Sequence, residues 1–282
     1  MPFESADAFR RFAARVKHDR RFIYEVEVET FLDAVFETCA SRTAPLQAGS
    51  ILWRAQLGSN WRIRDKGEPE EMEEEIPFFE DRMKPLPSVV RDGRANPRGI
   101  AYLYLGTTLA TAGSELRPWL GASISISQFQ TNSELMIADC TADKKKWPFK
   151  GFNADMTGTV PWGPEEYESV VWGDINEAMS IPYDPDESGL NYVPTQIISE
   201  RLRHGRLHGV AYRSLLAEGG TNIVLFDIKD ADPINFTVYE TEKVVYTFGQ
   251  RDNTWFAKKK TLSEEAATSN APEGHIAGSA GK

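Results

Sequence analysis

Residues 122–129 read ASISISQF, so apolar and polar side chains alternate from Ala122 to Ser127. Alternation with a period of two residues is typical of a β-strand. Further short apolar runs, bounded by turn residues, occur at 51–56, 100–106, 135–140, 209–215 and 222–228. Few helical patterns separate these runs, so the strands do not alternate regularly with helices. The sequence therefore predicts an α+β fold with a mixed or antiparallel sheet.

Helical patterns frame this predicted sheet. Residues 1–45 contain two of them, with Phe9, Phe12 and Val16 at helical spacing in the first, and we expect a helical N-terminal extension. The main domain is expected over 46–256. A short helix at 108–117 includes a glycine, Gly113, whose unfavourable helix propensity suggests close backbone packing. Two more helices are predicted near 163–180 and 194–204.

Two segments lack any periodicity. Residues 68–75 hold six glutamates, and prolines follow, so 65–92 is predicted to form a long acidic surface loop. A disordered segment and a lid over a pocket are both compatible with this composition. Residues 257–282 are small and polar, which predicts a disordered tail.

Composition excludes several classes of protein. The net charge of −10 argues against a nucleic-acid coat, because a phosphate backbone requires an excess of Lys and Arg. The two cysteines, Cys39 and Cys140, lack zinc-site spacing and favour a reduced, cytoplasmic setting. No run of about 18 apolar residues or signal peptide is visible, so we expect no membrane partner.

Three apparent motifs are weak. YDPDESG at 183–189 resembles the start of a calcium loop, but Thr195 occupies the position that requires a bidentate glutamate. Glu200, His204 and His208 have the spacing of metal ligands on a helix, yet Gly205 interrupts that helix.

The third weak motif is the pair Arg11 and His18, whose spacing fits some helical ribonucleases but also arises often by chance in a charged helix. No G-x-S-x-G elbow and no glycine-rich phosphate loop is present, so serine hydrolases and dinucleotide-binding folds lose their usual support.

Six polar residues lie within or near the ends of the predicted elements. They are Arg54, Arg94, Tyr104, Glu115, Ser214 and Asn222. Each alone has an ordinary structural explanation, such as an ion pair between Glu115 and Arg117, a core tyrosine, a turn serine or a capping asparagine.

Together they follow a known order. ILWRAQ, GRANPRGIAYLYLGTTLATAGSELRPWLG and YVPTQIISERLRHGRLHGVAYRSLLAEGGTNIVLFD, spread over about residues 50–228, resemble the RES-domain family, which is named for its Arg, Glu and Ser. The resemblance implies that Arg54, Glu115 and Ser214 are the family's three catalytic residues. It also implies that Arg94, Tyr104 and Asn222 bind the substrate.

RES-domain proteins are NAD-degrading enzymes, often toxins, with a fold similar to ADP-ribosyltransferase toxins. The resemblance thus implies NAD+ as substrate, inorganic phosphate as a candidate co-substrate, no cofactor and no metal, and a separate antitoxin as a candidate partner. In this chemistry Glu115 would stabilise an oxocarbenium-like state. Arg54 and Arg94 would bind the pyrophosphate, and Tyr104 would face the nicotinamide. Ser214 would donate a hydrogen bond to the ribose or to the attacking group. It is not expected to act as a nucleophile, because the sequence shows no base paired with it.

The acceptor of the cleaved group stays open. Water would make the chain a glycohydrolase and phosphate a phosphorylase, whereas a protein or nucleic acid would make it an ADP-ribosyltransferase. The last class often has a second acid two residues before the catalytic glutamate, where this chain has Gly113. A non-catalytic nucleotide-binding module and, less favoured, a ribonuclease centred on the N-terminal helices are the remaining alternatives.

Overall fold

The computed structural model of this chain describes residues 3–86, 89–142, 163–183 and 189–250. Contacts divide the chain into two compact units, Met1–Val244 and Val245–Lys282. The sheet, the helices and the candidate site all lie in the first unit. The expected tail at 257–282 lies outside the described residues, as does most of the calcium-like segment.

Nine strands form one sheet in the part of the chain that the structure describes. They pair in the order β1-β7-β8-β9-β5-β2-β6-β10, and β11 also pairs with β6. Their bounds are β1 Thr43–Leu46, β2 Ile51–Leu57, β5 Leu103–Gly106, β6 Ser123–Thr131, β7 Leu135–Asp139, β8 Gly209–Arg213, β9 Thr221–Leu225, β10 Ala231–Pro233 and β11 Thr237–Glu240. The pair β7–β8 is parallel and the other pairs are antiparallel, so the predicted α+β class with a mixed sheet is confirmed.

The alternating segment is strand β6, but its polar face is not exposed to water. Ser125 and Ser127 are completely buried. The hydroxyl of Ser125 donates to the carbonyl of Gly58 (2.8 Å) and accepts from the amide of Phe78 (2.9 Å). Ser125 thus ties the segments at Gly58 and Phe78 to this face of β6.

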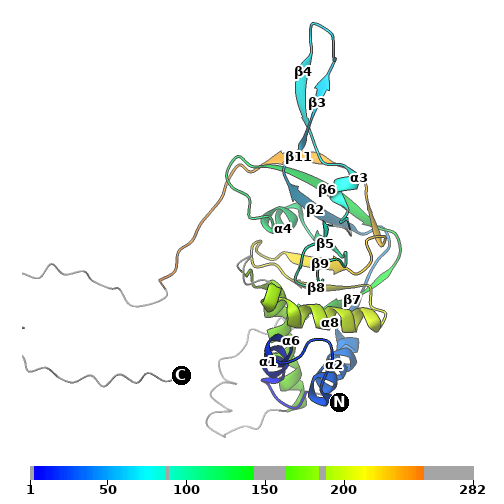
Figure 1. The fold of residues 1–282 in the computed structure, drawn as a ribbon, viewed down its shortest axis with the longest axis vertical. Coiled ribbons are helices and arrows are strands. Elements are labelled where there is room, and N and C mark those ends of the chain that lie inside the picture. The colour runs from blue at the N-terminus through cyan, green and yellow to red at the C-terminus, as the bar shows by residue number, and fades with distance from the viewer. Residues whose placement is uncertain (1–2, 87–88, 143–162, 184–188, 251–282) are drawn as a thin grey trace, which may run out of the picture. The chain divides into compact units, whose positions relative to one another are not determined.

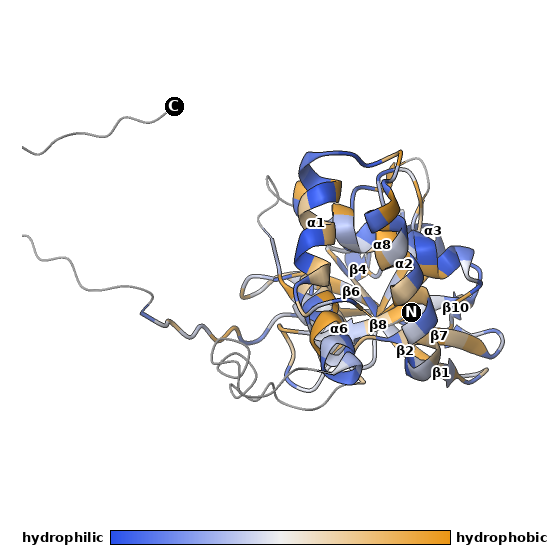
Figure 2. Cartoon of the chain, turned by 90° about the horizontal axis from the view of Figure 1, so that it is seen from below, coloured by the Kyte–Doolittle hydropathy of each residue, from blue (hydrophilic) through white to orange (hydrophobic). Residues whose placement is uncertain are grey.

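Four helices pack on one side of the sheet: α1 (Ala8–His18), α2 (Val26–Cys39), α6 (Pro164–Ser180) and α8 (Val193–His204), as Figure 1 shows. Each presents apolar residues on one side, drawn in orange in Figure 2, and polar ones on the other. The stacked rings of Phe12 and Phe31 (4.3 Å) share one core with Trp172 of α6 and Val210 of β8.

The N-terminal helices therefore belong to the same core as the sheet. A single 3₁₀ turn, η1 (Ala40–Arg42), leads from α2 into β1, which pairs with β7. The expected domain boundary near residue 45 does not coincide with a boundary between compact units, because α1 and α2 bury their apolar faces against the sheet and β1 is part of it.

A second apolar core covers the opposite face of the sheet and includes Leu103, Leu105, Ile223 and Leu225. Neighbouring residues in a strand point to opposite faces. Tyr104 and Asn222 are immediate neighbours of these four residues in β5 and β9. They therefore face the side of the sheet that carries the helices. This alternation assigns the polar positions of β5 and β9 to one face.

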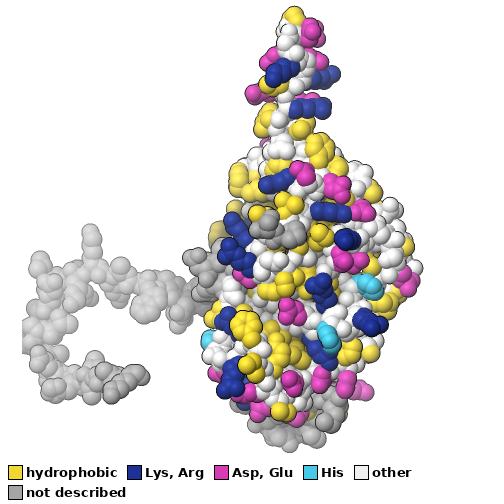
Figure 3. All heavy atoms as spheres, turned by 45° about the vertical axis from the view of Figure 1, so that its right-hand side comes forward, with side chains coloured by type: hydrophobic (Ala, Val, Ile, Leu, Met, Phe, Trp, Pro, Cys, Tyr) yellow, Lys and Arg dark blue, Asp and Glu magenta, His cyan; other side chains and the backbone are white. Residues whose placement is uncertain are grey.

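The segment predicted as a long acidic loop is partly regular structure. Strands β3 (Asn60–Arg64) and β4 (Met72–Ile76) form a separate hairpin that projects from the sheet, and helix α3 (Glu80–Met83) follows it. The glutamates are compatible with a strand because each one in β4 lies opposite a basic or apolar residue of β3, as in the Arg62–Glu74 ion pair (2.7 Å). Figure 3 shows both charge types and apolar side chains on its surface.

Candidate active site

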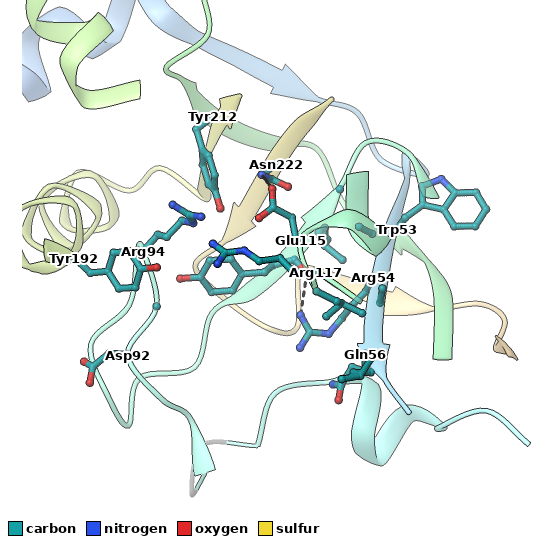
Figure 4. A pocket seen from close by; sticks show the side chains of 18 of the residues that line it. Trp53, Arg54, Gln56, Asp92, Arg94, Glu115, Arg117, Tyr192, Tyr212 and Asn222 are labelled. Carbon is teal, nitrogen blue, oxygen red and sulfur yellow. Dashed lines mark hydrogen bonds between the residues drawn. The ribbon is translucent and has the colours of Figure 1, made fainter. Parts of the chain in front are cut away.

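A cavity of about 840 Å³ is lined by residues from β2 and β5. These two strands are paired at one position in the described structure, Trp53 with Gly106. Arg54 bridges them beyond that pair, because its Nη1 donates to the main-chain carbonyl of Tyr104 (2.9 Å; Figure 4). The cavity thus lies where the sheet lacks continuous pairing.

Helix α4 (Leu109–Ser114) places Glu115 at the cavity. Thr108 caps its first turn, since the hydroxyl accepts from the amide of Thr111 (3.0 Å). A Cβ on Gly106 would lie 2.8 Å from the amide nitrogen of Ala112, so only glycine allows this approach of helix to sheet.

The expectation of close packing at Gly113 is wrong. Among the described residues, no atom beyond its immediate helix lies within 4 Å of a Cβ built there. The close approach of α4 depends on the glycine in the strand beneath it. Sequence alone could not distinguish the two, because the contact depends on how α4 packs on the end of β5.

The Glu115 carboxylate is held on one oxygen. Its Oε1 accepts from the hydroxyl of Ser214 (2.9 Å) and from the side-chain amide of Asn222 (2.7 Å). The Ser214 hydroxyl itself accepts from the main-chain amides of Leu216 (3.3 Å) and Ala217 (3.2 Å), which orients its proton toward the carboxylate. The other carboxylate oxygen has no hydrogen-bond donor among the described residues, so it is available to a ligand. Figure 4 shows Asn222 beside the carboxylate.

All six residues singled out in the sequence meet at this site. Five line the cavity, and the sixth, Ser214, contacts the carboxylate of Glu115. The lining members are Arg54, Arg94, Tyr104, Glu115 and Asn222.

Three arginines line the cavity. Burial lowers the pKa of Arg54 to about 10, and its Nε is buried without a hydrogen-bond partner in the described structure. Arg94 donates to the carbonyl of Ile181 and lies 5.8 Å from the centre of the Tyr192 ring. Each keeps donor capacity for an anion.

The third is Arg117, and an ion pair with it is the ordinary explanation that the sequence offers for Glu115. Instead Glu115 is hydrogen-bonded to Ser214 and Asn222, and no ion pair with Arg117 occurs among the described residues. Arg117 adopts a left-handed backbone conformation (φ 48°), which costs about 1–3 kcal/mol for a side-chain-bearing residue. Apart from its position two residues after Glu115, nothing in the sequence indicated that Arg117 lines the cavity.

The loop that carries Arg94 is folded around the Tyr104 hydroxyl. This hydroxyl donates to the side chain of Asn96 (2.7 Å), and a Cβ on Gly93 would lie 2.5 Å from it. Gln196 of α8 donates to the carbonyls of Gly93 (2.9 Å) and Asn96 (3.0 Å). These contacts fix the tyrosine ring and the loop together.

Three further tyrosines line the cavity and were not identified from the sequence. Tyr183 and Tyr192 pack edge to face at 5.6 Å. Tyr212 pairs with Asn222 across β8 and β9, and burial raises its pKa well above the usual value. In sequence Tyr212 is indistinguishable from a core residue of its strand, so its place at the cavity depends on the sheet register.

Comparison with known proteins adds a family assignment. The family model described as RES domain matches residues 51–247. The chain belongs to the RES domain family. No curated protein matches it.

Among solved structures, the RES chain is similar to one in the crystal structure of the M. tuberculosis MbcT–MbcA toxin–antitoxin complex. The two chains are 11% identical, with a TM-score of 0.40, over 73% of this chain and 92% of that one. A likeness of this degree carries no argument about the present chain.

The residues of the helical metal-like motif and of the Arg11–His18 pair do not line the cavity. His208 accepts from the amide of Met136 (3.0 Å) through Nδ1, and His204 is exposed. Arg11 donates to Ser5 (2.8 Å) on the surface of α1, where His18 is also exposed. No group of three His, Cys, Asp or Glu side chains in the described ranges could hold a metal, and no helix there is long and apolar enough to span a membrane.

Proposed function

We propose that this RES-domain chain consumes NAD+ by cleaving the bond between nicotinamide and ribose. The observation that carries the proposal is the Glu115 carboxylate, which Ser214 and Asn222 fix through one oxygen while the other is left for a substrate. A carboxylate in such a setting can accept hydrogen bonds from ribose hydroxyls and stabilise a developing positive charge.

The chemistry requires little more than this electrostatic stabilisation. Nicotinamide in NAD+ is a cationic ring that leaves as a neutral molecule, so the ribose carbon acquires oxocarbenium character as the bond breaks. A negative carboxylate fixed beside the ribose stabilises this state more than the ground state. Ser214 then acts as a positioning residue, because its hydroxyl contacts the carboxylate.

The rest of the cavity suits a dinucleotide. Arg54, Arg94 and Arg117 supply fork-shaped donors for a pyrophosphate. Tyr104 and Tyr212 supply aromatic faces and edges for the nicotinamide. A volume of about 840 Å³ is within the range of cofactor sites.

Water or inorganic phosphate would accept the ADP-ribosyl group, and the choice decides between glycohydrolase and phosphorylase. We further propose, from the family resemblance alone, that the activity is that of a toxin restrained by a separate antitoxin protein.

The test is nicotinamide release from NAD+ by the purified chain, with and without phosphate. We expect release by the wild type and a loss of about 10²–10³-fold in kcat for Glu115→Gln, because one preorganised charge is removed. Glu218→Gln is the matched control, since Glu218 is an exposed acid on the turn after Ser214.

Each outcome has a defined meaning. Release that requires phosphate identifies a phosphorylase, and an ADP-ribosylated protein product identifies a transferase. Equal turnover by wild type and Glu115→Gln would exclude Glu115 as the catalytic group. A folded wild-type chain that releases no nicotinamide would contradict the proposed activity.

A further inference from the structure

A second cavity, of about 450 Å³, adjoins the first. Gln56 of β2 lines both cavities, and it follows Arg54 on the same face of the strand, as Figure 4 shows. Arg91 lines the second cavity and Asp92, the next residue, lines the first. The two cavities are therefore neighbours along one strand and one loop.

The charged groups lining the second cavity are all positive. Arg82, Lys84 and Arg91 contribute to its wall, and no described carboxylate does. Lys84 is neutralised in part by Asp232 and by Glu80 at 3.6 Å. Arg82 and Arg91 form no ion pair with a described carboxylate. Two arginines thus remain free to bind an anion.

The geometry of these groups is partly fixed. The Gln56 side-chain amide donates to the main-chain carbonyl of Arg82, which ties α3 to β2. The Arg82 guanidinium lies over the Phe78 ring at 4.7 Å. The lining also includes apolar residues, among them Leu86 and Val89, which are both exposed. A cavity with apolar residues and convergent cations fits a planar ring that carries an acidic group.

The direction of a bound dinucleotide follows from the first cavity. With its nicotinamide ribose at Glu115 and its pyrophosphate at Arg54, its outer nucleoside lies on the Gln56 side, toward the second cavity. This step rests on the proposed function. A phosphate monoester on that outer ribose would carry about −1.5 to −2 charge and would lie among Arg82 and Arg91.

We propose that the second cavity is a subsite for a phosphate monoester on the outer nucleoside of the substrate. The chain would accordingly bind NADP+ more tightly than NAD+. Arg82 and Arg91 would bind this phosphate, and the apolar residues would pack on the adjacent base.

The test uses titration calorimetry on the full chain carrying Glu115→Gln, which prevents turnover, with NAD+, NADP+ and inorganic phosphate as probes. We expect NADP+ to bind about tenfold more tightly than NAD+. Adding Arg82→Gln or Arg91→Gln should weaken NADP+ binding about tenfold and leave NAD+ within twofold. Adding Arg98→Gln, an exposed arginine outside both cavities, should change neither.

Several results would overturn the inference, and they separate it from the proposed function. If the protein binds NAD+ and NADP+ with equal affinity, and neither arginine substitution changes the two affinities, the subsite is excluded and the proposed function stands. Free phosphate binding that depends on Arg82 and Arg91, without any preference for NADP+, replaces it by a free-anion site. Binding of neither dinucleotide by folded protein would contradict both proposals.

Discussion

The hydrogen bonds around Ser214 allow a quantitative prediction for Ser214→Ala. The substitution removes one of the two donors to Glu115 Oε1, at 2.9 Å, from a residue that is 4% exposed. A hydrogen bond to a charged acceptor contributes about 1.5–3 kcal/mol. The amides of Leu216 and Ala217 also lose an acceptor, but their bonds are long and the turn is accessible to water. We therefore expect the free energy of unfolding to fall by about 2 kcal/mol.

In a compact unit of this size about 2 kcal/mol lowers Tm by roughly 4–8 °C, which thermal denaturation resolves. The carboxylate keeps its bond to Asn222, so kcat for nicotinamide release should fall by about tenfold, corresponding to 1.4 kcal/mol in the barrier. If Ser214 acts only through Glu115, the loss should appear in kcat more than in KM.

Ser199→Ala is the matched control. Ser199 is fully buried in α8, and its hydroxyl donates to an uncharged acceptor, the carbonyl of Thr195 (2.8 Å). Its loss should cost about 1 kcal/mol and leave kcat unchanged. A Ser214→Ala variant with no greater stability loss than Ser199→Ala and with normal turnover would refute the positioning role.

Two further predictions use the same assays. Gly106→Ala would bring a Cβ to 2.8 Å from the amide nitrogen of Ala112, so it should destabilise the fold by about 1–3 kcal/mol and reduce turnover by displacing α4. Gly113→Ala, with open space around its Cβ, should stabilise the fold by about 0.5–1 kcal/mol. The reverse order of the two variants in thermal denaturation would be inconsistent with this packing. ADP-ribose at 100 times its Kd should raise the free energy of unfolding by about 2.7 kcal/mol, and a tenfold weaker Kd in Arg54→Met should reduce this to about 1.4 kcal/mol; an equal ligand effect in both proteins would exclude Arg54 from the anion site.

The sequence was sufficient to predict those helices and strands that local residue patterns determine. Alternation identified β6, and helical spacing with a proline near its start identified α8. The prediction of a loop was wrong for Met72–Ile76, since β4 pairs with β3 and the Arg62–Glu74 ion pair joins the two strands, which the linear pattern does not display. Local propensity is a weak guide where a cross-strand partner decides the structure.

Motif order was enough to select six residues of the candidate site, because the family's polar positions lie in a recognisable sequence context. It did not select Arg117, Tyr183, Tyr192 or Tyr212, whose side chains reach the cavity only through backbone conformation, helix packing or strand register. Helix propensity pointed to close packing at Gly113, whereas the glycine that permits the close approach of α4 is Gly106.

By itself the sequence determined the class of fold, most of the strands and helices, and the residue types available for chemistry, since these follow from periodicity and composition. Only the tertiary structure decided that Ser214 and Asn222, from β8 and β9 and their turn, meet Glu115 at the end of α4 on one carboxylate oxygen. The physical reason is that hydrogen bonds between residues about a hundred positions apart depend on which strands pair and in which register.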